Sequence, residues 1–272
     1  MLTVEAAREK LRGLGQGAVT LNNRFAPGIA LIVIDNAAHH NALSGKMMVE
    51  FHDIVLNLEC SVDKSDLVAI IVTGSPGRSF CAGLDLSFAR EHLHDEAISA
   101  AVSKVMNDAL ERFSRLPLIT AASVAGPALG GGTELLTAFD FICSASTAFI
   151  HFVQTRMGVS SPWGGARRLV NHIGRKQALR LLASAPRISA AEAKSIGLVD
   201  LVVQPGRSDT YNLCLSATIE FLKPYITDET DERVAPAAVR AMKQLVVRTA
   251  GDADLEFEER LFASVAAGSS KL

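Results

Sequence analysis

The stretch that decides the fold is Leu129-Gly130-Gly131-Gly132-Thr133-Glu134, in which three consecutive glycines are followed closely by a carboxylate. The apolar segment 118–124 lies upstream and predicts a buried strand. Residues 134–139 have the pattern of a helix. We therefore expect the glycines to form a turn between a strand and a helix, where the absence of side chains lets another group approach the backbone closely.

Such a turn has two interpretations. The first N–H groups of a helix lack acceptors, and together with the positive end of the helix they stabilise an oxyanion that develops on a thioester or ester carbonyl. Glu134 is then a candidate acid or base. A packing role explains the same residues, because glycines permit close contact between a helix and a strand and Glu134 complements the helix dipole. A second segment favours the functional interpretation.

That segment is Ser79-Phe80-Cys81-Ala82-Gly83-Leu84-Asp85-Leu86, which follows a strand-like run at 67–72 and a turn at 73–77. Together the two segments resemble the enoyl-CoA hydratase/isomerase (crotonase) superfamily. The resemblance implies that one oxyanion N–H comes from the residue after the glycine of A-G-x-D. The other comes from the middle glycine of G-G-G-x-E. In this chain these catalytic donors are Leu84 and Gly131, beside Glu134.

The resemblance covers about residues 29–203 and implies an α/β fold, a spiral of β-β-α units followed by a C-terminal helical part that packs between subunits of a homotrimer or hexamer. It also implies an acyl-CoA thioester as substrate, with the adenine and the pantetheine arm contacting the region from His40 and the carbonyls near Cys81. The expected binding residues are His40, Asn41, Ala42, Cys81, Ala82, Asp85, Gly130, Gln154 and Trp163. Trp163 is equally compatible with a packing role.

The reaction depends on how many carboxylates the site holds. The superfamily's hydratases use a second glutamate about twenty residues after the first, so that water is activated and a proton delivered. Gln154 stands at that position here, and a glutamine cannot exchange a proton near neutral pH. This substitution argues against efficient hydration and against isomerisation that needs a second carboxylate.

Further motifs resemble superfamily members that decarboxylate ethylmalonyl-CoA and methylmalonyl-CoA. They are found at 41–48, at 112–119, and within 152–165. The chain departs from that pattern at Gln154, where histidine is expected, and at Ser160-Ser161-Pro162-Trp163, where the proline is shifted by one. Loss of carbon dioxide yields a thioester enolate without a base, so we expect a carbon-carbon lyase of malonyl-type thioesters.

Two questions stay open at the sequence level. Glu134 is either protonated, giving a proton to the enolate, or ionised, repelling the substrate carboxylate. The alternative activities are an enoyl-CoA hydratase or isomerase that uses Glu134 alone, and a non-catalytic subunit that binds acyl-CoA.

Composition agrees with one α/β core and narrows the partners. The chain has 272 residues, 49% hydrophobic and 21% charged, with a net charge of -2. We expect a core over 1–204, with a helical extension at about 1–17, and a helical oligomerisation region over 205–272. The net charge gives no electrostatic reason to expect nucleic acid or an anionic membrane, and the apolar runs are too short to span a membrane, so neither partner is predicted. The basic pairs Arg167-Arg168 and Arg175-Lys176 are expected on helix surfaces.

No cofactor or metal is expected beyond the coenzyme A of the substrate itself. The four cysteines lack C-x-x-C spacing and suggest reduced thiols, and the histidines at 92 and 94 fit a solvated helix start better than a metal site. The terminal Ser270-Lys271-Leu272 matches the tripeptide recognised by the peroxisomal import receptor. We expect a peroxisomal protein; chance or a cloning remnant, with a cytoplasmic location, is the alternative.

Hydrophobic periodicity predicts alternating strands and helices. Strands are expected at 29–35, 67–73, 118–124 and 141–144. Helices are expected at 45–58, 96–115, 165–171, 175–183, 209–222, 236–249 and 255–265.

Overall fold

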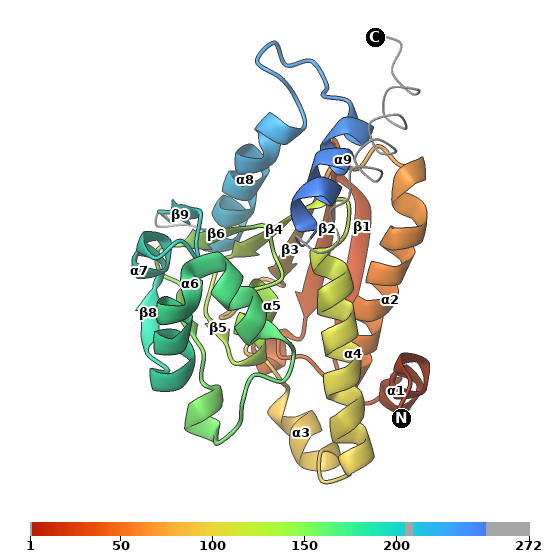
Figure 1. Ribbon diagram of the computed structural model, residues 1–272, viewed down its shortest axis with the longest axis vertical. Helices are drawn as coiled ribbons and strands as arrows, with labels where there is room; N and C mark the ends of the chain where they lie inside the picture. Colours follow the sequence, from red (N-terminus) through yellow and green to blue (C-terminus); the bar gives the residue numbers. More distant parts are fainter. Residues whose placement is uncertain (1, 205–208, 249–272) are drawn as a thin grey trace.

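A six-stranded sheet with the order β1-β2-β3-β4-β6-β9 runs through the centre of the protein (Figure 1). The computed structural model describes residues 2–204 and 209–248. β1 pairs antiparallel with β2, and each of the other neighbours in this sheet pairs in parallel. The strands are β1 (Ala18–Ala26), β2 (Ile29–Asp35), β3 (Ala69–Gly74), β4 (Ile119–Val124), β6 (Phe141–Ala145) and β9 (Leu201–Val203).

A second, three-stranded sheet carries the glycine turn. Its order is β5-β7-β8, with β5 parallel to β7 and β7 antiparallel to β8. These strands are β5 (Ala128–Leu129), β7 (Phe149–His151) and β8 (Arg187–Ser189). The glycines therefore follow the two-residue strand β5, and not β4 directly as the sequence suggested.

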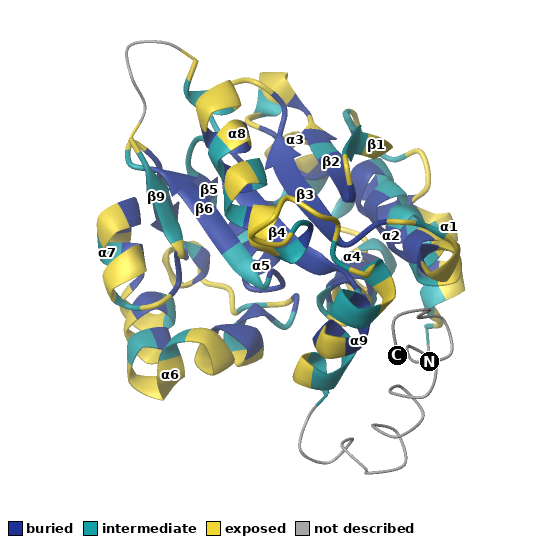
Figure 2. Ribbon diagram, turned by 90° about the horizontal axis from the view of Figure 1, so that it is seen from above, coloured by how far each residue is buried: buried dark blue, intermediate teal, exposed yellow. Residues whose placement is uncertain are grey.

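Helices cover both faces of the central sheet. They are α1 (Val4–Leu11), α2 (Gly45–Ser61), α3 (Leu86–His92), α4 (Glu96–Ser114), α5 (Gly131–Leu136), α6 (Gly165–Ser184), α7 (Ala190–Ser195), α8 (Thr210–Leu222) and α9 (Pro236–Val247). The main core forms between the sheet and the helices α1, α2 and α4, and a second cluster lies where α8 packs on the other face. Both β3 and β4 are buried along their full length (Figure 2).

The predicted α/β architecture is confirmed, and burial explains which strands were recognised. Parallel strands covered on both faces are continuous apolar runs, so β2, β3, β4 and β6 were predicted to within two residues. The edge strand β1 was missed because its tip is polar and exposed. The helical extension expected at about 1–17 is wrong beyond residue 11, where glycines with positive φ at 13, 15 and 17 break the helix.

The helix predictions differ mainly at their ends. α5 begins at Gly131, not at Glu134, because the glycines themselves take up the first turn. The two helices expected on either side of residue 174 form α6, which is interrupted by non-helical backbone at Gly174 (φ 74°, ψ 162°). The helix predicted at 255–265 lies outside the described residues. Within 2–204 and 209–248, no helix is long and apolar enough to span a membrane.

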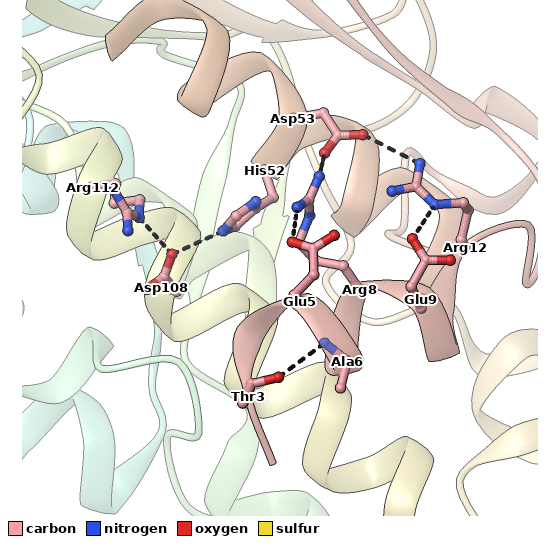
Figure 3. A network of polar contacts seen from close by, with 10 residues as sticks. All are labelled: Thr3, Glu5, Ala6, Arg8, Glu9, Arg12, His52, Asp53, Asp108 and Arg112. Atoms are coloured by element: carbon pink, nitrogen blue, oxygen red, sulfur yellow. Dashed lines mark hydrogen bonds and ion pairs between the residues drawn. The ribbon is translucent and has the colours of Figure 1, made fainter. Parts of the chain in front are cut away.

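A polar network joins α1, α2 and α4 at one end of the main core (Figure 3). The buried His52 donates from Nε2 to Asp108 Oδ2 at 2.9 Å, and Arg112 donates from Nε to the same oxygen at 2.6 Å. Arg8 of α1 pairs with Asp53 of α2. Burial raises the pKa of Asp108, but the hydrogen bonds from His52 and Arg112 outweigh it and hold that pKa below its usual range.

This network gives a stability prediction. Asp108→Ala is expected to lower the free energy of unfolding by about 1–3 kcal/mol at neutral pH, because it leaves the buried His52 nitrogen without a partner. The stabilisation by Asp108 is complete above the unfolded-state pKa and disappears as pH falls through the lowered folded-state pKa, so the difference shrinks below about pH 4. Urea unfolding of the parent protein and of Asp108→Ala at several pH values measures this difference in the free energy of unfolding.

The exposed ion pair between Arg12 and Glu9 supplies the control. Glu9→Ala is expected to change the free energy of unfolding by about 0.5 kcal/mol or less. An Asp108→Ala variant as stable as a Glu9→Ala variant would show that the contacts of Asp108 with His52 and Arg112 do not stabilise the packing of α4 on α2.

Candidate active site

The two glycine-containing segments meet side by side. Cys81 forms a parallel bridge with Ala128, and Leu129 N donates to Cys81 O at 3.0 Å. A Cβ atom on Gly83 would lie 2.7 Å from the backbone nitrogen of Gly131. Only glycine fits this approach, because such a short Cβ contact is sterically excluded. The structure thus brings together the two segments that the sequence assigned to one site.

Two backbone donors are open where these segments meet. Leu43 N donates to Gly83 O at 2.7 Å, and Asp85 N donates to Leu43 O at 3.0 Å. In an extended chain alternate residues face opposite sides, so the N–H of Leu84 points away from Leu43. Gly131 is the first residue of α5, where the helix leaves its N–H free. Within the described part of the chain neither N–H has a protein acceptor, and both residues are partly exposed.

Glu134 is buried and surrounded by hydrogen-bond donors. Its Oε2 accepts from Ser161 Oγ at 2.6 Å, from Trp163 N at 2.9 Å and from Gly165 N at 3.2 Å. The side chain is only 1% exposed. Two of these donors are backbone amides, which cannot accept a proton in return.

The other carboxylate oxygen of Glu134 faces Gln154. Gln154 Nε2 donates to Glu134 Oε1 and to Gly130 O, both at 3.2 Å. The second contact fixes the amide orientation, because a flipped amide would place two carbonyl oxygens against each other. Gln154 Nε2 and the two backbone amides can only donate to Glu134, and the Ser161 hydroxyl can donate to it as well, so four donors surround the carboxylate.

Two side chains that the sequence analysis did not assign complete this environment. Arg168 was expected on a helix surface, but it is only 7% exposed and donates to Trp163 O at 2.7 Å and to Thr137 Oγ1 at 3.2 Å. Burial lowers the pKa of Arg168, and the negative charge of Glu134 opposes that shift. Ser161, the other, is the hydroxyl donor to Glu134. The signal for Arg168 was its position three residues after Gly165, in an i, i+3, i+4 pattern that Leu169 completes.

Trp163 lies against the glycine turn. A Cβ atom on Gly131 would lie 2.2 Å from Cζ3 of the Trp163 ring, and Trp163 is 2% exposed. Its indole N–H is buried and has no hydrogen-bond partner among the described residues. Trp163 therefore acts as a wall of the site next to a candidate oxyanion donor, and it also presents an unused donor.

Comparison with known proteins agrees with this geometry. A family model described as enoyl-CoA hydratase/isomerase matches residues 24–267. The chain belongs to the enoyl-CoA hydratase/isomerase family. The resemblance inferred from the two glycine segments is thereby confirmed.

Relatives within the enoyl-CoA hydratase/isomerase family span most of the chain. The chain is 38% identical to ethylmalonyl-CoA decarboxylase of Danio rerio, over 97% of this chain and 85% of the relative. It is 34% identical to ethylmalonyl-CoA decarboxylase of Xenopus laevis, over 97% and 84%. The crystal structure of enoyl-CoA hydratase from Bacillus anthracis is similar, with 27% identity, a TM-score of 0.76, and coverage of 92% of this chain and 90% of that one.

Not every predicted binding residue of this family member has a free side chain. Asn41 is fully buried: its Nδ2 donates to Ser75 O and Ser79 O, and its Oδ1 accepts from Asn36 N and Ser75 Oγ. The Asn41 amide therefore connects loops of the protein, and contact with a substrate is left to its backbone. His40 is exposed, and its carbonyl accepts from Ala82 N at 3.1 Å.

The carbonyls of two further predicted residues, Cys81 and Ala42, are already used as hydrogen-bond acceptors within the protein. The carbonyl of Cys81 already accepts from Leu129 N, and that of Ala42 accepts from Asn36 Nδ2 at 2.8 Å. Burial raises the pKa of the Cys81 thiol to about 12, so this thiol is not a nucleophile. Asp85 lies one residue beyond Leu84 and is 3% exposed. Across the described ranges, no group of three or more His, Cys, Asp or Glu side chains is arranged to hold a metal ion.

Proposed function

We propose that this family member decarboxylates a malonyl-type CoA thioester, with ethylmalonyl-CoA and methylmalonyl-CoA as substrates. The observation that carries the proposal is the pairing of two open N–H donors with a single carboxylate, because Gln154 stands 3.2 Å from Glu134 where a second acid would be needed for hydration. The names of the two relatives reported above support the same substrate class.

The donors act on the thioester carbonyl. Its oxygen accepts hydrogen bonds from Leu84 N–H and Gly131 N–H. The bond between the α-carbon and the carboxylate breaks, its electron pair forms the enolate, and carbon dioxide leaves. Each donor is expected to contribute about 3–4 kcal/mol to the transition state, because the N–H groups are fixed before charge develops.

Glu134 acts on the carboxylate that leaves. The hydrogen-bond donors around Glu134 favour its ionised form, which repels the negatively charged carboxylate of the bound substrate. This repulsion ends when the carboxylate leaves as neutral carbon dioxide. The α-carbon then takes its proton from water, since an ionised Glu134 has none to give.

Gln154→Glu tests whether decarboxylation depends on Glu134 being the single carboxylate of the site. The variant places a second carboxylate next to Glu134, restoring the pair that hydration needs. It also removes the amide that donates to Glu134 Oε1, and two carboxylates this close share a proton, so Glu134 loses part of the charge that acts on the substrate carboxylate. We expect decarboxylation to fall at least tenfold and hydration of crotonyl-CoA to become measurable, by about 10²-fold over the parent protein. Release of labelled carbon dioxide and loss of enoyl absorbance measure the two reactions.

Gln177→Glu is the matched control, because Gln177 lies on α6 and contacts Arg180 instead of the site. Faster decarboxylation in Gln154→Glu, or equal effects of both substitutions, would contradict the assignment of Gln154.

We also propose a peroxisomal homotrimer or hexamer. The support for import is the tripeptide Ser270-Lys271-Leu272, which lies outside the described residues. The support for assembly is the family resemblance. Fluorescence microscopy of an N-terminally tagged chain with and without Leu272, and light scattering of the purified protein, test the two parts separately.

A further inference from the structure

Asp85 makes more contacts than a helix cap requires. It caps α3, its Oδ1 accepting from Ser87 N at 2.7 Å and from Phe88 N at 3.3 Å. Its Oδ2 accepts from His39 Nδ1 at 2.6 Å and from Asn36 Nδ2 at 3.1 Å. One carboxylate thus connects the start of α3 to the segment that follows β2.

These contacts surround the backbone of Leu84. Leu43 pairs with the residues on both sides of Leu84, through Gly83 O and Asp85 N. Asn36 Nδ2, which donates to Asp85, also donates to Ala42 O at 2.8 Å. The carboxylate is therefore linked to both strands of the bridge that orients the Leu84 peptide.

We propose that Asp85 is a positioning residue, which sets the direction of the Leu84 N–H toward the thioester carbonyl and uses His39 as its second anchor. The inference rests on the proposed function, because it assumes that this N–H polarises a bound thioester. Asp85 was expected to bind substrate, but its buried carboxylate has donors of the protein on both oxygens. It acts through Leu84 without contact to the reacting atoms.

The charge of Asp85 supports this role. Burial raises the pKa of Asp85, but hydrogen bonds from His39, Ser87 and Phe88 outweigh it and hold that pKa below its usual range. The carboxylate therefore keeps all its contacts at neutral pH.

The substitution Asp85→Asn tests the proposal. Asparagine caps helices as well as aspartate does, but its NH₂ cannot accept from Asn36, and it keeps a contact with His39 only when the ring takes the tautomer in which Nδ1 accepts. We expect kcat for decarboxylation to fall by about 10–10²-fold, within the range for loss of one oxyanion donor, with KM within twofold. The absorption of bound 4-dimethylaminocinnamoyl-CoA, which moves to longer wavelength when its carbonyl is polarised, should shift less than in the parent protein.

Asp95 provides a matched control. It caps α4 in the same way, through Ala97 N at 2.7 Å, and it is exposed. Asp95→Asn should leave kcat, KM and the absorption shift unchanged. His39→Ala, which keeps the cap of α3, should reduce kcat and the shift partly, and it tests the proposal even if Asp85→Asn does not fold.

The outcomes separate positioning from other roles. An unchanged absorption shift in both variants, or a rise in KM with kcat unaltered, would overturn the proposal. The shift does not depend on turnover. If the parent protein shifts the chromophore but decarboxylates nothing, the proposed function fails, while a reduced shift in Asp85→Asn still supports positioning.

Discussion

Gly83→Ala is expected to lower kcat/KM for the malonyl thioester by about 10²–10³-fold, the loss typical of one missing oxyanion donor. A Cβ atom at this position would lie 2.7 Å from Gly131 N and 2.8 Å from Leu129 O. The methyl group therefore separates the two segments and moves both donors. Steady-state kinetics with the purified variant measure the loss.

Gly197→Ala is the control for this experiment. Both glycines have positive φ, +91° at Gly83 and +81° at Gly197, so both variants carry backbone strain of about 1–2 kcal/mol. A Cβ atom at Gly197 has nothing within 4 Å. Near-parental activity in Gly197→Ala and loss of activity in Gly83→Ala would assign the effect to the two N–H donors. Equal activity in the two variants would show that these donors do not contribute to catalysis.

Glu134→Gln is the second substitution with a large expected effect. The amide is neutral, so it cannot repel the substrate carboxylate. Its NH₂ group must replace either Oε1, which accepts from Gln154, or Oε2, which accepts from Ser161 and Trp163, and it cannot accept a hydrogen bond in either place. We expect kcat to fall by about 10²-fold or more. Because donors lose their acceptor, unfolding should also become easier by about 1–3 kcal/mol.

The comparison for Glu134→Gln is Glu192→Gln, since Glu192 also lies in the first turn of a helix, α7, but pairs with Arg180 near the surface. Turnover and thermal unfolding of both variants separate the site from a general helix-dipole effect. Undiminished turnover in Glu134→Gln would refute a role for this carboxylate in either protonation state.

The features that could be predicted from the sequence are those that depend on local residue patterns. Strands β3 and β4 are buried along their full length and β2 along most of its length, so these strands were predictable from sequence pattern. The convergence at Gly83 and Gly131 was implied by the family resemblance. The roles of Ser161 and Arg168 arise only when the loop before α6 folds over Glu134. The contact of Ser161 joins residues far apart in the chain and leaves no periodic trace, and the helical spacing of Arg168 indicates its burial but not its partners.

The predicted binding residues also show that a sequence motif does not determine the contacts of its side chains. The resemblance places Asn41 and Cys81 near the substrate, but the structure uses the Asn41 amide and the Cys81 carbonyl for contacts between its own loops. A motif fixes which residue stands at a position, whereas the hydrogen-bond partners of its atoms depend on the surrounding tertiary structure. The hydrogen-bond donors around Glu134 likewise come from several segments of the chain.

Mass spectrometry of the purified protein with a mixture of ethylmalonyl-CoA, methylmalonyl-CoA and crotonyl-CoA tests the central claim most directly. The account predicts butyryl-CoA and propionyl-CoA, with crotonyl-CoA unchanged. Hydration of crotonyl-CoA with both malonyl thioesters intact would contradict it and favour a hydratase that uses Glu134 alone. Binding of all three without conversion would contradict it as well and indicate a non-catalytic acyl-CoA-binding protein.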